Sequence, residues 1–238
     1  MPEQTPAIVL VHGAFADSAS WSAVIEELQA RGLEVIAAAN PLRSVAGDAA
    51  YVRDVIKAVG KPVVLVAHSY GGFVITEAAA RNSAVRRLVY VAGFAPEHGE
   101  SAFQLATKFP GSTLGDAVTS YPLSAGGNEL AIRQDIFRRQ FAEDVPATPA
   151  AVMGATQRPA TEAALTTGLP TDAPAWKDIP SWFVFGDQDR TIPVELHRFM
   201  ADRAEAEVSR ELAGASHALS VSEPKAVTAT ILEAVAAS

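Results

Sequence analysis

Short apolar runs alternate with helix-length amphipathic segments through the first part of this chain. The runs expected to form strands are 7–11, 33–39, 62–67 and 87–91, and the helices expected between them are 18–31, 48–59 and 73–81. Continuous apolar strands joined by helices are typical of a parallel sheet that is buried on both faces. We therefore predict an α/β fold, with a mostly parallel sheet of about six strands and helices on both faces.

The alternation stops at about residue 96 and resumes near residue 179. The later segment predicts strands at 182–185 and 206–212 and helices at 194–204 and 225–236. The intervening residues are rich in Pro, Gly, Thr and Ala, and their clearest helical pattern is 129–141. We expect a core made of residues 1–95 and 179–238 and a helical cap insertion made of residues 96–178. A mobile segment at 146–171 is the alternative for part of that insertion.

Composition limits the classes of protein that this chain can belong to. Of its 238 residues, 49% are hydrophobic and 19% are charged, which is unlike a disordered chain. The 19 Lys and Arg against 27 Asp and Glu give a net charge of −8, which argues against nucleic-acid binding. The absence of cysteine excludes disulfides, thiolate catalysis and Cys-ligated metals.

No segment of the sequence predicts a cofactor, a metal or a membrane. Neither a glycine-rich phosphate loop nor a His-Glu-x-x-His pattern is present, so we expect neither a cofactor nor a metal. The N-terminus has no basic region ahead of an apolar stretch, and the apolar runs are strand-sized. We therefore expect a cytoplasmic protein without membrane association, whose oligomeric state the sequence does not indicate.

The sharpest local motif is Ala67-His68-Ser69-Tyr70-Gly71-Gly72, between an expected buried strand and an expected helix. A serine at such a turn projects its hydroxyl from the carboxyl edge of the sheet, and small residues are needed two positions before and after it. The N-terminus of the next helix directs its N–H groups to the same place. The motif therefore predicts that Ser69 is a nucleophile.

A serine nucleophile needs a base to take its proton, and a carboxylate to orient that base. His217 lies in the loop after the last expected strand, which opens at the same sheet edge as Ser69. Asp187 and Asp189 both follow the preceding strand, and spacing alone does not choose between them. We interpret the other four histidines as structural (His12 and His68) or as surface residues (His98 and His197).

Two backbone N–H groups are candidates for binding the oxyanion of a tetrahedral intermediate. One belongs to Tyr70, directly after Ser69. The other lies in the loop after the first strand, where Gly13 allows a tight turn that can direct the Ala14 N–H inward. An ordinary glycine turn is the alternative for this loop.

These motifs together resemble the α/β-hydrolase family. The similar segments are 9–15, 67–72, 186–193 and 216–224, in the order of that family, and the layout resembles its methylesterase and hydroxynitrile lyase subgroup with bacterial relatives. One departure is Ala67, where the elbow motif usually has glycine. The resemblance implies Ser69, Asp189 and His217 as the triad, because the family's acid takes the fourth position of Gly-x-x-Asp. It also implies Ala14 and Tyr70 as oxyanion donors, with Phe15 as the alternative to Ala14.

Two positions bear on the reaction within that subgroup. Cyanohydrin-cleaving members carry threonine after the first-strand histidine and lysine after the catalytic histidine, whereas this chain has Gly13 and Ala218. The expected function is therefore hydrolysis of carboxylic esters of small to medium apolar molecules through an acyl-enzyme. The alternatives are perhydrolase, haloperoxidase, lyase or amidase activity at the same triad, and a non-catalytic ligand sensor. The candidates for the pocket wall are aromatic: Phe15, Phe94 and Trp176, and also Phe103 and Phe137.

Overall fold

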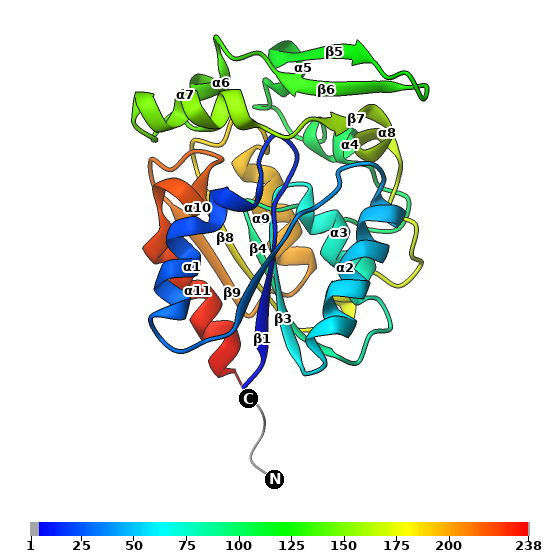
Figure 1. The fold of residues 1–238 in the computed structure, drawn as a ribbon, viewed down its shortest axis with the longest axis vertical. Helices are drawn as coiled ribbons and strands as arrows, with labels where there is room; N and C mark the ends of the chain where they lie inside the picture. Colours follow the sequence, from blue (N-terminus) through cyan, green and yellow to red (C-terminus); the bar gives the residue numbers. More distant parts are fainter. Residues whose placement is uncertain (1–4, 238) are drawn as a thin grey trace.

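A computed structural model describes residues 5–237 of the chain. Its centre is a six-stranded parallel sheet in the order β2-β1-β3-β4-β8-β9 (Figure 1). The strands are β1 (Ala7–Val11), β2 (Val35–Ala38), β3 (Val63–His68), β4 (Val85–Val91), β8 (Ser181–Gly186) and β9 (Val208–Leu212). The predicted α/β class is confirmed, and each strand expected in the core is present with both ends within two residues of the prediction.

Residues that alternate along a central strand belong to two different apolar clusters. Val63, Leu65 and Ala67 of β3 pack in one cluster, and Val64 and Val66 pack in the other. Successive side chains of a strand point to opposite faces of the sheet. Both faces of the sheet are therefore buried, which is why these strands have continuous apolar sequences.

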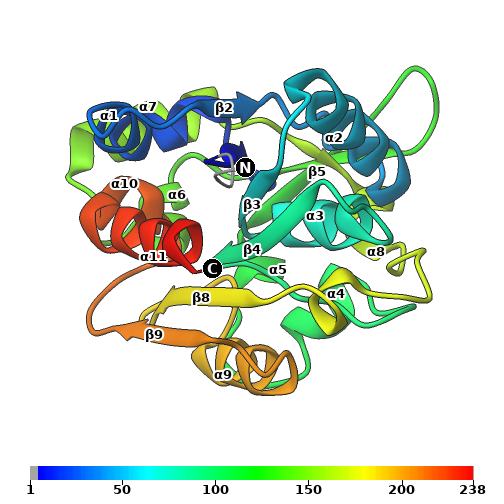
Figure 2. The same cartoon turned by 90° about the horizontal axis from the view of Figure 1, so that it is seen from below.

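Helices cover both faces of this sheet, as the view from below shows (Figure 2). One face carries a short 3-10 turn, η1, and three helices: η1 (Ser18–Trp21), α1 (Ser22–Gln29), α10 (Leu219–Ser222) and α11 (Pro224–Ala236). The other face carries α2 (Val45–Val59), α3 (Gly71–Ala79) and α9 (Val194–Arg203). The side chain of Ser44 caps the start of α2 by accepting the Gly47 N–H, so α2 begins three residues before the predicted helix.

The chain between β4 and β8 forms a layer over the carboxyl ends of the strands (Figure 1). This cap contains a three-stranded antiparallel sheet, β5-β6-β7. Its elements are α4 (Ala102–Ala106), α5 (Leu114–Ala117), β5 (Val118–Pro122), β6 (Asn128–Ile132), α6 (Phe137–Phe141), α7 (Ala147–Thr156), β7 (Ala160–Thr161) and α8 (Glu162–Thr166). The 3-10 turn η2 (Ala175–Lys177) follows α8 and leads the chain back to the start of β8. The cap is thus mixed rather than purely helical, and the segment 146–171 contains α7, β7 and α8.

The helix predicted over 129–141 is wrong in its first half. Residues 128–132 form β6, paired with β5 through a turn at Gly126 and Gly127, which both have positive φ. Leu130 and Ile132 are buried while their neighbours are only half-buried, which is the period of a strand. The apolar residues Ile132, Ile136 and Phe137 have the spacing of a helix, but only α6 is helical within this range.

Among the described residues, no helix has both the length and the apolar character that a bilayer crossing needs.

Candidate active site

Ser69 stands at a sharp turn between the end of β3 and the start of α3. Its φ of +52° is in the left-handed region, which costs a non-glycine residue roughly 1–2 kcal/mol. The Ser69 carbonyl accepts the N–H of Gly72 at 2.9 Å and of Phe94 at 3.2 Å, which holds the turn. A Cβ on Gly71 would lie 2.6 Å from the Val11 carbonyl oxygen. Contact with β1 therefore explains why this position must be small.

His217 forms a short hydrogen bond with Asp189 across two loops at the same edge of the sheet. His217 Nδ1 lies 2.6 Å from Asp189 Oδ2, and both side chains are buried. The other oxygen, Oδ1, accepts the N–H groups of Thr191 at 2.8 Å and Ile192 at 2.9 Å. Asp187 is directed elsewhere, because its Oδ1 accepts the Gly214 N–H at 2.7 Å. Of the two candidate acids, the structure brings Asp189 to His217.

His68 joins the Ser69 turn to the His217 loop. His68 Nε2 lies 3.0 Å from the His217 carbonyl oxygen, and the two imidazole rings are 4.6 Å apart. Burial, together with the adjacent His217, lowers the pKa of His68 to about 3. His68 is therefore neutral and donates its Nε2–H to that carbonyl. The expectation that His68 is structural agrees with this contact.

The Nε2 atom of His217 is buried and has no hydrogen-bond partner among residues 5–237. No hydrogen bond between this nitrogen and the Ser69 hydroxyl is formed in this conformation. Phe141 of α6 lies edge-on against the His217 ring at 4.8 Å and shields it from above. The His217 lone pair therefore remains available in a site from which water is largely excluded.

Asp189 is fully ionised in this environment. Burial by itself raises the pKa of the Asp189 carboxyl, but the nearby His217 and the N–H of His197 outweigh burial and hold this pKa well below its ordinary value. An ionised carboxylate can keep the proton of a neutral imidazole on Nδ1, which leaves Nε2 unprotonated. This is the state that a general base requires.

His197 was expected at the surface, and that expectation is wrong. Its side chain is buried, and its Nε2 lies 3.2 Å from Asp189 Oδ2. The signal for burial was present in the sequence, because His197 stands three residues before Met200 and four before Ala201, on the apolar side of α9. The position of a histidine on the helix therefore indicates its burial better than its polarity does. His98, in contrast, is exposed as expected.

The loop after β1 lies directly against the Ser69 turn. A Cβ on Gly13 would lie 2.6 Å from Ser69 Cβ and 3.2 Å from the Tyr70 nitrogen. The Phe15 N–H donates to the Arg158 carbonyl at 3.0 Å, whereas the N–H groups of Ala14 and Tyr70 have no acceptor among the described residues. Of the two candidates in this loop, Ala14 is therefore the one with a free donor.

A small apolar cavity lies beside Ser69, beneath the cap. It has about 30 Å³ of free space. Its lining includes Ala14, Phe15, Ser69, Tyr70, Phe94, Ala102, Phe103, Ala106, Leu114, Leu165 and Thr191. Phe15, Phe94 and Phe103 are thus placed where the sequence predicted a pocket wall.

Two other aromatic candidates lie outside this cavity. The indole N–H of Trp176 donates to the Pro96 carbonyl at 2.8 Å, and the guanidinium of Arg203 lies 5.4 Å from the indole ring. Phe137 packs against Phe141, at 5.1 Å between ring centroids. Trp176 therefore packs against α9 and the segment after β4, and Phe137 packs within the cap.

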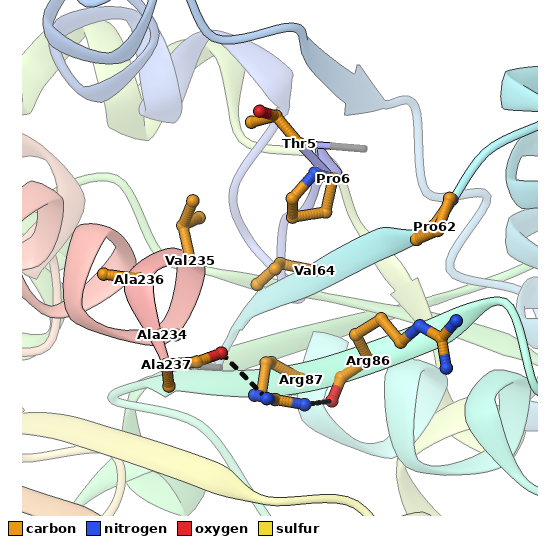
Figure 3. Close-up of a pocket in the computed structure, with 10 residues that line it drawn as sticks. All are labelled: Thr5, Pro6, Pro62, Val64, Arg86, Arg87, Ala234, Val235, Ala236 and Ala237. Atoms are coloured by element: carbon orange, nitrogen blue, oxygen red, sulfur yellow. Dashed lines mark hydrogen bonds between the residues drawn. The ribbon is translucent and has the colours of Figure 1, made fainter. Parts of the chain in front are cut away.

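A larger hollow of about 250 Å³ lies at the opposite end of the sheet, where the strands begin (Figure 3). Its lining residues are Thr5, Pro6, Pro62, Val64, Arg86, Arg87 and Ala234–Ala237. None of the candidate catalytic residues is among them. Size alone therefore does not identify the site, because the candidate catalytic residues lie at the carboxyl edge.

Cap residues are bonded to both loops that carry the His–Asp pair. Asp144 accepts the Ser216 N–H at 3.1 Å and the Ser216 hydroxyl, directly before His217. Gln140 Nε2 donates to the Arg190 carbonyl at 2.8 Å, directly after Asp189. The cap therefore contacts both loops that carry the pair. Among residues 5–237, no group of three or more acidic or imidazole side chains could hold a metal ion.

Comparisons with known proteins agree with this geometry. The sequence model of the Alpha/beta hydrolase family matches residues 8–230. The carbendazim hydrolyzing esterase of Nocardioides sp. (strain SG-4G) is 34% identical over 116 residues, which are 42% of this chain and 47% of that protein. The matched region thus spans about half the length of this curated relative.

Solved structures share the fold over nearly the whole chain. The pyrethroid hydrolase of Sphingobium faniae JZ-2 has a TM-score of 0.77 and 22% identity, covering 98% of both chains. Polyneuridine aldehyde esterase has a TM-score of 0.81 and 18% identity, covering 97% of this chain and 99% of the other. At these identities, the likeness concerns the fold.

Proposed function

Since this chain belongs to the α/β hydrolase family, we propose that it is a serine hydrolase that cleaves carboxylic esters of small to medium apolar molecules. The observation that carries the proposal is the 2.6 Å contact between His217 and Asp189 at the sheet edge where Ser69 follows the end of β3. The esterase and hydrolase names of the relatives support the same reaction class.

The proposed reaction begins with attack of Ser69 Oγ on the ester carbonyl. His217 takes the hydroxyl proton on Nε2 and later returns it to the departing alcohol. Asp189 holds the ring orientation and stabilises the imidazolium that forms. Water then attacks the acyl-enzyme with the help of the same histidine, which releases the acid and restores Ser69.

The N–H groups of Ala14 and Tyr70 are proposed as the oxyanion donors. Both are free of other acceptors, and the contact of Gly13 with Ser69 keeps their loops adjacent. Backbone donors of this kind stabilise the tetrahedral intermediate more than the flat ester, because negative charge develops on the oxygen only as the bond forms. Tyr70 is anchored for this task, because its hydroxyl donates to Asp48 at 2.9 Å.

The substrate group that enters the cavity is proposed to be apolar and short. Phe15, Phe94, Phe103 and Leu165 provide an apolar wall for such a group. A cavity of this small size accommodates a short acyl chain more readily than a long one.

The test is steady-state hydrolysis of p-nitrophenyl esters, from acetate to octanoate, by wild type and Ser69→Ala. We expect the wild type to turn over many times, with kcat/KM highest for short acyl chains. Ser69→Ala should fold normally, with an unchanged circular dichroism spectrum, and lose activity by roughly a thousandfold or more. Near-wild-type rates in the variant would refute Ser69 as nucleophile. No turnover in either protein would favour a ligand-sensing role, which ligand-induced shifts in Tm would then examine.

A further inference from the structure

The Asp189 carboxylate accepts four hydrogen bonds, and the mechanism above uses only one of them. Thr191 and Ile192 donate backbone N–H groups to Oδ1, whereas His217 and His197 both reach Oδ2. The two imidazoles therefore share one acceptor oxygen. The contact with His217 is 2.6 Å and the contact with His197 is 3.2 Å, so His217 has the stronger bond.

His197 is packed in a buried, largely apolar environment. Its side chain projects from α9 towards the sheet and is buried there, and its ring stacks on Phe185 of β8 with 4.9 Å between centroids and 11° between planes. Its Nδ1 is buried and has no hydrogen-bond partner in the described part of the chain. The bond to Asp189 is thus the contact that satisfies a ring nitrogen of His197.

The electrostatic surroundings keep His197 neutral. Burial lowers the pKa of His197 although Asp189 acts in the opposite direction. The other titratable groups that influence His197 are His217, which lowers its pKa further, and Glu211, which raises it. A neutral imidazole facing a carboxylate donates its proton, so His197 is the Nε2–H tautomer.

We propose that His197 is a positioning residue, which holds the Asp189 carboxylate in place and disperses its charge and thereby sets the basicity of His217. This inference rests on the proposed serine-hydrolase function. A carboxylate that accepts a second N–H on the same oxygen attracts His217 less strongly than one that does not. Removing the His197 donor should therefore stabilise the His217 imidazolium and also loosen the orientation of Asp189.

Three variants separate this role from simple packing. His197→Phe keeps an aromatic ring against Phe185 and removes the donor, whereas His197→Gln keeps an N–H at nearly the same place. Met200→Ala is the matched control, because Met200 is buried in the same helix and its sulfur contacts the Ala95 N–H instead of Asp189. The measurements are Tm, the pH profile of kcat/KM, and the NMR signals of the imidazole ring protons and nitrogens.

In His197→Phe, we expect the acidic limb of the pH profile to move upward by about half a pH unit or more. The His217 Nδ1 proton should move downfield, because its bond to Asp189 strengthens. His197→Gln should restore both properties towards wild type. Met200→Ala should lower Tm without moving the limb or the signal. An unmoved limb and signal in a folded His197→Phe would overturn the inference.

One measurement, the NMR spectrum of the wild type, does not depend on catalysis or on the folding of a variant. In the wild type, ring nitrogen shifts should identify His197 as a neutral Nε2–H tautomer at pH 7 to 8, and a protonated or Nδ1–H ring there would overturn the inference. If wild-type turnover is not abolished by Ser69→Ala, the proposed function fails. The NMR signals of His197 and His217 still decide whether the two imidazoles share Asp189.

Discussion

Two carboxylates that are two positions apart in one loop have different partners. Asp187 Oδ1 accepts the Gly214 N–H and so ties the loop after β8 to the loop after β9. Asp189 is turned inward, where the N–H groups of Thr191 and Ile192 fix one oxygen and leave the other for imidazole. Both residues are aspartates in the loop after β8, and the direction in which each side chain points gives them different hydrogen-bond partners.

The pair Asp189→Asn and Asp187→Asn tests this difference. We expect Asp189→Asn to lower kcat by about 10⁴-fold, because an amide can hold His217 in the wrong tautomer and cannot stabilise the imidazolium. Asp187→Asn should remain within a few-fold of wild type, since its amide oxygen can still accept the Gly214 N–H. The measurement is kcat and KM for one p-nitrophenyl ester. Equal losses of kcat in both variants would show that activity depends on the conformation of the loop and not on the carboxylate of Asp189.

At the scale of elements, the site is assembled from loops that lie far apart in the sequence. The turn after β3, the loop after β8 and the loop before α10 meet because all parallel strands end at one edge. The cap contributes by bonding to two of these loops, through Asp144 to Ser216 and through Gln140 to Arg190. The loops that carry the His–Asp pair are therefore held by the cap as well as by the sheet.

Asp144→Asn is expected to weaken the attachment of the His217 loop. The charged acceptor of the Ser216 N–H and hydroxyl is replaced by a neutral amide, at a cost of about 1 kcal/mol. We expect kcat to fall several-fold while Tm changes little. Glu143→Gln is the matched control, because the neighbouring Glu143 makes an exposed ion pair with Arg190 at 3.0 Å, and such pairs contribute little. A Glu143→Gln effect as large as that of Asp144→Asn would contradict the role assigned to the Ser216 contact.

At the scale of the whole molecule, burial of neutral histidines couples folding to pH. Burial lowers the pKa values of His12, His68 and His197. In the unfolded chain these groups return to the ordinary value of 6.5 and bind protons as the pH falls below it. The unfolded state then holds more protons than the folded state. Stability is therefore fully present above about pH 6.5 and is lost as the pH falls towards the folded values.

For His68 the expected loss between pH 7 and pH 5 is about 2 kcal/mol, because its folded pKa of about 3 lies below this whole interval. Urea unfolding at pH 5, 6 and 7 measures the change. His68→Gln keeps a donor for the His217 carbonyl and should reduce the pH dependence by about this amount. His98→Gln, at an exposed position, should leave it unchanged. A His68→Gln variant with the wild-type pH dependence would contradict the neutral state of buried His68.

Local patterns determined a large part of this protein. Continuous apolar runs such as 7–11 and 62–67 can be buried only between two layers of helices, so the parallel sheet and its strand limits followed from sequence. The Ser69 turn and the His217 loop also followed, because each motif is contained in a few adjacent residues. The sequence also excluded the opposite edge of the sheet as the place of the site, because loops after parallel strands all emerge at one edge.

Tertiary structure alone decided the remaining features, because each depends on contacts between segments distant in the chain. The burial of His197 beside Asp189 and the place of Trp176 outside the cavity belong to this group. The strand at 128–132 does as well, because its hydrogen bonds are made with β5 and β7 and not within a helix. A periodic pattern states which residues seek burial, but only the folded chain supplies the partner that buries them.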